Sequence, residues 1–137
     1  MQAFARLFAA LADTTRLRLL NLIAGREVCV CYLVEVLRLS QPKISRHLAY
    51  LRRAGVVEAR REGKWMHYRL SEPENAEAAG ILAAVLEALR REKPMQADEA
   101  KLARACCTPQ KLVLPDGAPL PVAVAGVTHL RDREGRR

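Results

Sequence analysis

The chain has 137 residues, of which 50% are hydrophobic and 28% charged, so it can bury one small core and is not globally disordered. No stretch approaches the roughly 18 apolar residues of a membrane span and no signal-peptide pattern is present, which predicts a cytoplasmic protein without a membrane partner. The net charge is +8, and residues 36–70 carry nine basic against two acidic side chains, a net +7. Such concentration favours a polyanion-binding surface, although a merely solvated basic face has the same composition.

The first part of the chain predicts four helices. Apolar residues recur at helical spacing over residues 2–12, and Asp13 is an N-cap signal for a second helix. A third helix is expected to start near residues 27–29 and to continue to about residue 37. Ser40 opens a fourth helix, which Gly55 ends.

The second part predicts a hairpin and two more helices. Residues 57–70 alternate with period two around Gly63, which is typical of a β-hairpin. Residues 74–91 form a helix with a continuous apolar stripe that needs a partner. A shorter helix is expected over residues 96–105, followed by an extended or disordered tail over residues 108–137.

This order of elements is that of a winged helix-turn-helix, a mainly α fold with a β-hairpin. The helix-turn-helix lies at residues 27–54, and its second helix would enter the major groove of DNA. A small helical domain with a purely structural hairpin has a similar outline. Trp65 and Tyr68 are expected to pack the hairpin onto the body, and His67 to be a structural hydrogen-bonding residue.

Polar side chains gather at the N-terminal end of the fourth helix, the end that reaches base edges. Glutamine can pair with adenine and arginine with guanine, whereas Ser45, Arg52 and Arg53 suit phosphates. Arg60, Arg61 and Lys64 surround the hairpin turn and would follow the phosphate backbone. The alternative is an ordinary solvated surface. The predicted DNA contacts are Gln41, Lys43, Ser45, Arg46, His47, Arg52, Arg61 and Lys64.

Two of the four cysteines, Cys29 and Cys31, stand two residues apart. Side chains at this spacing do not lie on one face of a regular helix. They can converge only at a distorted first helical turn, which is where we expect them. A helix N-terminus also favours the thiolate. In a reducing compartment cysteines are thiols rather than a disulfide framework, although a lone buried cysteine is usually a small hydrophobic residue. No Cys-x-x-Cys, nucleophile with a base, or glycine-rich phosphate loop is present, so we do not expect an enzyme.

Four segments together resemble the arsenic-responsive members of the ArsR/SmtB family of bacterial repressors: "LADTTRLRLL", "EVCVCYL", "SQPKISRHLAYLRRAG" and "REGKWMHYRLS". The resemblance covers about residues 4–92. It implies a homodimer that pairs through the first helix and the helix at residues 74–91. It further implies repression from a palindromic double-stranded operator, relieved when As(III) or Sb(III) binds cysteine thiolates. Two-fold protein symmetry also matches helix-turn-helix geometry.

The sequence departs from the family's arsenite pattern, in which a third cysteine follows three residues after the second, because Val34 stands there. We therefore expect Cys106 and Cys107 to complete the site with Cys29 and Cys31, within one subunit or across the dimer, or to form a site of their own. Four thiolates equally suit Cd(II), Pb(II) or Zn(II), and a thiol redox sensor would use the same residues.

The expected organisation has three parts. Residues 1–92 form the DNA-binding and dimerisation domain, residues 93–107 a C-terminal helix that carries Cys106 and Cys107, and residues 108–137 the tail. Residues 74–91 contain no histidine, so the family's second metal site on that helix is not expected. Inducer binding would displace the third helix and misplace the DNA-reading residues of the fourth.

Overall fold

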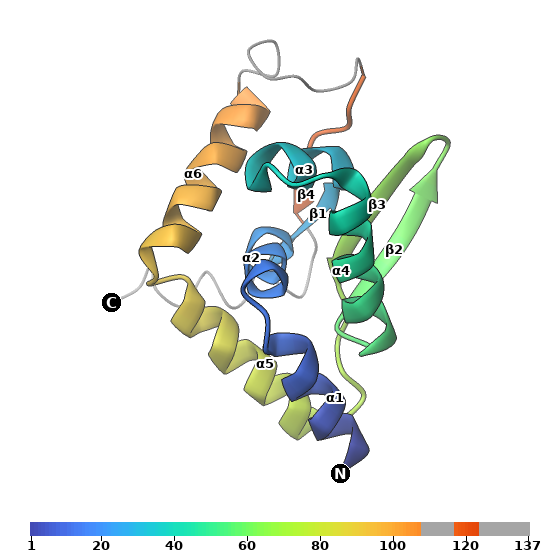
Figure 1. Cartoon of the computed structure of the whole chain (residues 1–137), viewed down its shortest axis with the longest axis vertical. Helices are drawn as coiled ribbons and strands as arrows, with labels where there is room; N and C mark the ends of the chain where they lie inside the picture. Colours follow the sequence, from blue (N-terminus) through green and yellow to red (C-terminus); the bar gives the residue numbers. More distant parts are fainter. Residues whose placement is uncertain (108–116, 124–137) are drawn as a thin grey trace.

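The structure, a computed structural model, describes residues 1–107 and 117–123 (Figure 1). Most of the tail predicted for residues 108–137 lies outside this described part. The helices and strands, in chain order, are α1 (Gln2–Leu11), α2 (Thr14–Ile23), β1 (Arg26–Cys29), α3 (Val30–Leu37), α4 (Gln41–Arg53), β2 (Val57–Glu62), β3 (Trp65–Leu70), α5 (Ala76–Leu89), α6 (Lys93–Cys107) and β4 (Val122–Ala123).

The predicted helices are confirmed, and side chains cap two of them. The Asp13 carboxylate accepts a hydrogen bond of 3.0 Å from the backbone N–H of Arg16 at the start of α2. Asn75 does the same for the first turn of α5. Both satisfy N–H groups that have no partner inside the helix. Gly55, which follows the end of α4, has a φ of +78°. Glycine adopts this left-handed conformation at little cost, and so lets the chain leave the helix.

The expected start of the third helix was wrong. Residues Arg26–Cys29 form strand β1, and helix α3 begins only at Val30 with Cys29 as its N-cap. β1 runs antiparallel to β3, with Cys29 opposite His67 in the register. The strand forms because a distant hairpin supplies its partner, and tertiary pairing of this kind overrides local helical preference.

The hairpin belongs to a four-stranded sheet with the order β2-β3-β1-β4, in which all neighbours are antiparallel. The register of β2 and β3 runs from Val57 opposite Leu70 to Glu62 opposite Trp65, and Gly63 turns the chain with a φ of +58°. β4 pairs with the other side of β1, so β1 lies inside the sheet. This hairpin is the wing of the fold.

The core lies around α2 and α3, where Leu19, Leu20, Tyr32 and Leu33 are fully buried. α4, α5 and α6 pack around α2, and the end of α6 lies beside α3 (Figure 1). Trp65 and Tyr68 pack against this core, as predicted. Within the described ranges, no helix combines the length and the apolar character needed to cross a membrane.

Candidate DNA-binding surface and thiol site

Helix α4 presents part of the predicted reading face. Gln41, Lys43 and Arg46 are exposed, but Ser45 and His47 are half-buried, so the expectation that all five are exposed was wrong for these two. His47 lies on the flank of the apolar stripe that buries Ile44 and the residues one and two turns later. Its Nδ1 lies 3.8 Å from Asp13 Oδ1 at the start of α2. His47 therefore lies between the protein body and the open surface that Lys43 and Arg46 share.

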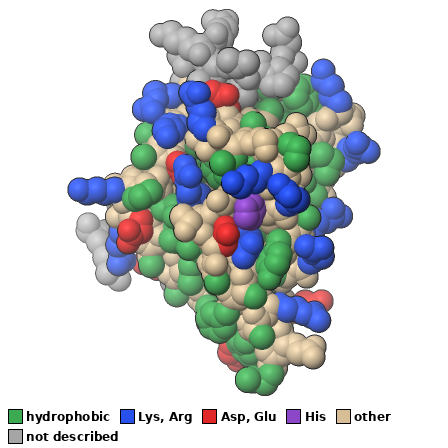
Figure 2. Space-filling model, in the orientation of Figure 1, with side chains coloured by type: hydrophobic (Ala, Val, Ile, Leu, Met, Phe, Trp, Pro, Cys, Tyr) green, Lys and Arg blue, Asp and Glu red, His purple; other side chains and the backbone are tan. Residues whose placement is uncertain are grey.

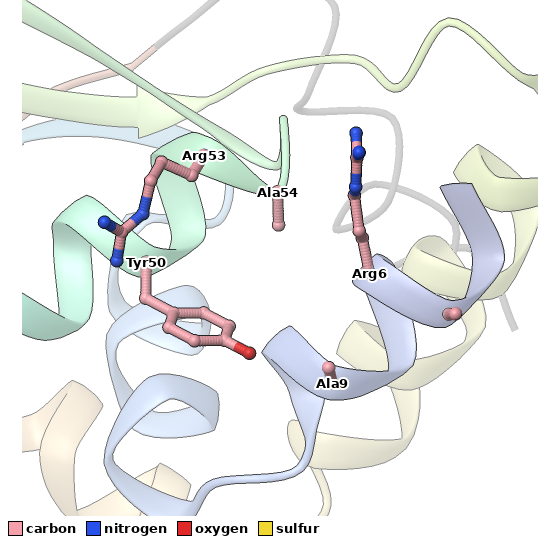
Figure 3. Close-up of a pocket in the computed structure, with 6 residues that line it drawn as sticks. Arg6, Ala9, Tyr50, Arg53 and Ala54 are labelled. Atoms are coloured by element: carbon pink, nitrogen blue, oxygen red, sulfur yellow. The ribbon is translucent and has the colours of Figure 1, made fainter. Parts of the chain in front are cut away.

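The same helix borders two open clefts that are lined by cations. One, of about 470 Å³, is lined by Arg16, Lys43, Arg46, His47, Ala49, Tyr50 and Arg53. The other, of about 460 Å³, lies between α4 and α1, where Arg6 and Arg53 stand on opposite sides and Tyr50 points toward Ala9 (Figure 3). Neither lining contains a carboxylate. The guanidinium of Arg16 stacks over the ring of Tyr50 at 4.2 Å, and Tyr50 and Arg53 line both clefts.

The last turn of α4 and the wing carry further exposed cations. Arg52, Arg61 and Lys64 are all exposed, and Lys64 Nζ lies 4.9 Å from the centre of the Trp65 ring. Figure 2 shows Lys and Arg side chains spread over the face that contains α4 and the hairpin, with few acidic side chains among them. This surface has the charge that a phosphate backbone requires.

Arg60 differs from its neighbours, because its guanidinium pairs with two carboxylates of the protein, although about half of the side chain is exposed. Its Nη2 lies 2.6 Å from Glu27 Oε1 on β1, and its Nη1 lies 3.0 Å from Glu62 Oε2. The prediction that it follows the phosphate backbone therefore finds no support in its contacts. Sequence reasoning missed this ion pair, because its two partners lie 33 residues apart and strand β1, which adds Glu27 to the sheet of the hairpin, was not predicted.

Cys29 and Cys31 converge at the junction of β1 and α3. The Cys31 thiol donates a hydrogen bond to Cys29 Sγ at 3.2 Å, and Cys29 is 1% exposed. The convergence was predicted, but a strand-to-helix junction produces it rather than a distorted helical turn. Cys29 has extended backbone angles, and the chain enters α3 immediately after it.

The two thiols share one proton. Hydrogen bonds from the Cys31 thiol, and from the backbone N–H groups of Cys31, Met66 and Val30, lower the pKa of Cys29 to about 7 despite its burial. The pKa of Cys31 is raised, because its proton is held by Cys29 and because the thiol is buried. The pair therefore presents one thiolate near neutral pH, and the next proton is held firmly.

Cys106 lies on the last turn of α6, half-buried and packed against the core. Burial raises the pKa of Tyr32, and negative charge on Cys106, Cys31 and Cys29 raises it further, so all three thiols lie near this ring. Within the described residues, no three His, Cys, Asp or Glu side chains stand close enough to hold a metal ion. The side chain of Cys107 lies outside the described part. The described residues therefore bring Cys29 and Cys31 together but do not bring Cys106 to them.

Residues 13–59 match the family model described as bacterial regulatory protein, arsR family. The arsenical resistance operon repressor of Escherichia coli (strain K12) is 49% identical over 105 residues, which cover 75% of this chain and 87% of that protein. The chain belongs to the ArsR family. Similarity to the arsenic resistance transcriptional regulator ArsR1 of Pseudomonas putida is higher, 59% over 64 residues, but spans 46% of this chain and only 50% of that protein.

A solved structure described as a possible ArsR-family transcriptional regulator has the same architecture. The homodimeric winged helix-turn-helix DNA-binding domain Mb0332 from Mycobacterium bovis is 31% identical, with a TM-score of 0.53, and the match covers 67% of this chain and 86% of that one. This ArsR-family chain is accordingly a winged helix-turn-helix, DNA-binding transcriptional repressor. In such a fold α4 is the recognition helix and the β2–β3 hairpin is the wing.

Proposed function

We propose that this chain represses an arsenic-resistance operon and leaves its operator when As(III) or Sb(III) binds the thiolates of Cys29 and Cys31. The observation that carries the proposal is the contact between these two sulfurs, 3.2 Å apart, with a thiolate already favoured near neutral pH. The similarity to proteins named arsenic-resistance repressors supports the choice of metalloid.

The sulfur separation is close to what one bound ion requires. Two sulfurs that each lie about 2.3 Å from a common ion stand roughly 3.3–3.8 Å apart, so only a small displacement of Cys31 is needed. Binding displaces the shared proton. We assign the third thiolate to Cys106 or Cys107, because α6 ends beside α3 and trivalent arsenic favours three thiolates.

The DNA-binding role rests on α4 and the wing. Gln41, Lys43 and Arg46 are the residues we assign to base edges and nearby phosphates, because they are the exposed polar groups at the N-terminal end of the recognition helix. Arg52, Arg61 and Lys64, together with the half-buried Ser45 and His47, are assigned to the phosphate backbone.

A homodimer on a palindromic operator completes the proposal. α1 packs against α5, and Phe8 on α1 is 54% exposed, while Ile81, Val85 and Leu89 on α5 are half-buried. An apolar face of this kind is suited to a second copy of the chain. Residues 1–92 would then supply DNA binding and pairing, and residues 93–107 the additional thiols.

The test is release of DNA from the reduced full chain. A fluorescent palindromic duplex, selected by the protein from a random pool, is followed by anisotropy during titration with arsenite and antimonite. Parallel titrations use cadmium, lead, zinc and peroxide. We expect arsenite and antimonite to release the duplex at the lowest concentrations. Release by cadmium, lead or zinc alone would identify a divalent-metal repressor, and release by peroxide alone a redox sensor.

Cysteine variants locate the site. Cys29→Ser and Cys31→Ser should abolish arsenite release while DNA affinity without arsenite stays within about twofold of the parent. Cys106→Ser and Cys107→Ser are then compared with each other. The variant from which arsenite releases DNA less readily identifies the residue that supplies the third thiolate. Retained release in both Cys29→Ser and Cys31→Ser would move the site to α6.

A further inference from the structure

Strand β1 belongs to the thiol site and to the sheet of the wing at once. Cys29 is the last residue of β1, and in the register it stands opposite His67 of β3. The backbone N–H of Met66, the neighbouring residue of β3, hydrogen bonds to the Cys29 sulfur. A ligand bound to the Cys29 sulfur is therefore linked to the wing through the hydrogen bond from Met66. This link does not involve the recognition helix.

A second link joins β1 to the wing through side chains. Glu27, two residues before Cys29, is 9% exposed and accepts hydrogen bonds from Arg60 Nη2 at 2.6 Å and from Arg60 Nε at 3.1 Å. Arg60 lies on β2, the outer strand of the wing, and also donates to Glu62 at 3.0 Å. The Arg60 guanidinium holds the pKa of the Glu27 carboxyl below its usual range, so the pair is ionised at neutral pH.

A buried histidine fills the space between the two carboxylates. His67 is 4% exposed, its Nδ1 lies 3.9 Å from Glu27 Oε1, and its Nε2 lies 3.4 Å from Glu62 Oε2. Glu62 is the last residue of β2, next to the turn that carries Lys64. The hydrogen bonds of Arg60 to Glu27 and Glu62 thus extend from the thiol strand to the tip of the wing. His67 Nε2 has no hydrogen-bond partner among the described residues, so the hydrogen-bonding role expected for His67 is not seen at this atom.

The wing also contains an ion pair that makes no hydrogen bond to β1, although the charge of its arginine adds to the lowering of the Glu27 pKa. Arg69 on β3 lies 2.9 Å from Glu58 on β2, and both side chains are about half exposed. Neither residue belongs to β1. This pair has the same chemistry as Glu27 with Arg60, in the same hairpin, and serves as its matched control.

We propose that the wing responds directly to the ligand at Cys29 and Cys31, and that Glu27 and Arg60 are the positioning residues that transmit the response. The inference rests on the proposed function and adds the path by which ligand binding at the thiols reaches the DNA-binding surface. When an ion binds both sulfurs, Cys29 shares with Cys31 the small displacement that the ion requires, and β1 shifts with Cys29. Glu27 then pulls Arg60, and the adjacent wing residues Arg61 and Lys64 lose their alignment with the phosphate backbone.

The first experiment compares Glu27→Gln with Glu58→Gln in the full chain. Duplex affinity is measured with and without arsenite, and the ratio of the two dissociation constants is the coupling, for which about 30- to 150-fold is expected in the parent. Glu27→Gln should reduce this ratio at least about fivefold, whereas Glu58→Gln should leave it within about twofold. Arsenite affinity of the DNA-free protein should be unchanged in both variants, because neither residue is a ligand.

The second experiment uses the single tryptophan of the chain, Trp65, which begins β3 and is half-buried. Arsenite should change Trp65 emission in the DNA-free parent and in Glu58→Gln, and clearly less in Glu27→Gln. Release of DNA by arsenite with equal coupling in all three proteins would overturn the inference while leaving the proposed function standing. If arsenite fails to release DNA from the parent, the proposed function fails and the inference fails with it.

Discussion

Cys29 and Cys31 behave as one acid, because the thiol of one stabilises the thiolate of the other. The pKa of Cys29 is about 7 in the folded chain, below the roughly 8.5 of an ordinary thiol. Because the folded-state value is the lower one, deprotonation stabilises the fold. This stabilisation is fully present above about pH 8.5 and is lost as the pH falls through 7. The same proton must leave when a thiophilic ion binds.

Replacing Cys31, which donates the hydrogen bond, should show how far the pKa of Cys29 depends on that bond. In a Cys106→Ser, Cys107→Ser background, Cys31→Ala removes the hydrogen bond to Cys29 and should raise the pKa of Cys29 by about one unit. Cys31→Ser keeps a hydroxyl donor and should leave the midpoint near 7. The measurement is a pH titration of thiolate ultraviolet absorbance. Equal midpoints in the two variants would show that the backbone N–H groups alone set the value.

Arg46 is the residue for which a loss of DNA affinity should be largest. It is an exposed cation on the recognition helix, and a bidentate contact with guanine contributes about 1–3 kcal/mol. Arg46→Ala should therefore weaken duplex binding about 5- to 150-fold without changing arsenite affinity. Lys101→Ala, an exposed cation on α6, should change duplex binding less than about twofold. An unchanged DNA affinity in Arg46→Ala would remove this residue from the interface.

At the scale of the elements, α6 is fastened to the body by two ion pairs. Arg18 on α2 donates through Nε and Nη2 to both oxygens of Asp98, at 2.7 and 2.8 Å, and Asp98 is 1% exposed. Arg26 on β1 pairs with Glu99 at 2.8 Å. Asn21 Nδ2 donates to the carbonyl of Met95. These contacts hold the helix that carries Cys106 against the elements that carry Cys29.

Breaking the buried pair should destabilise the whole fold. Asp98→Ala leaves Arg18 without its partner, and we expect the free energy of unfolding to fall by about 2–4 kcal/mol. Glu87→Ala, which removes an exposed pair between Glu87 on α5 and Arg91 just beyond the end of that helix, should cost less than about 1 kcal/mol. Urea unfolding at one fixed protein concentration measures both. Similar losses of unfolding free energy in the two variants would mean that the buried pair of Asp98 contributes no more to stability than the exposed pair of Glu87.

The elements also show which features a sequence can reveal. The helices and the hairpin follow from local periodicity and capping residues, such as Asp13, and these were predicted. β1 was not, because four residues carry little pattern and their partner strand comes much later in the chain. The Glu27–Arg60 pair was missed for the same reason. The convergence of Cys29 and Cys31 could be anticipated because two thiols so close along the chain have few places in which to meet.

For the whole molecule, DNA affinity should depend on pairing of two copies. A palindromic site is read by two recognition helices at a fixed spacing, so a monomer loses one of them. Phe8 is the largest exposed apolar side chain on α1 apart from the terminal Met1. It is therefore the residue to change in a test of the proposed dimer face.

Phe8→Glu should convert the dimer to a monomer, because it would place a carboxylate of each copy on the apolar face through which the two copies are proposed to pair. Sedimentation velocity should show the lower mass, and duplex affinity should fall at least about tenfold. Ala100→Glu, on an exposed position of α6, should alter neither. A dimer that persists in Phe8→Glu would place the subunit contact elsewhere.

The pairing of β4 with β1 has a consequence for solubility. β4 hydrogen bonds along Arg26 and Glu27, with Ala123 and Val122 as register partners, and so covers what would otherwise be the open edge of the sheet. An uncovered strand edge is a template for the same strand of another molecule. A chain shortened to end at Cys107 would expose that edge, and open-ended association would then compete with the closed two-fold pair. The short β4 strand would in this way act as a guard against fibre-like assembly.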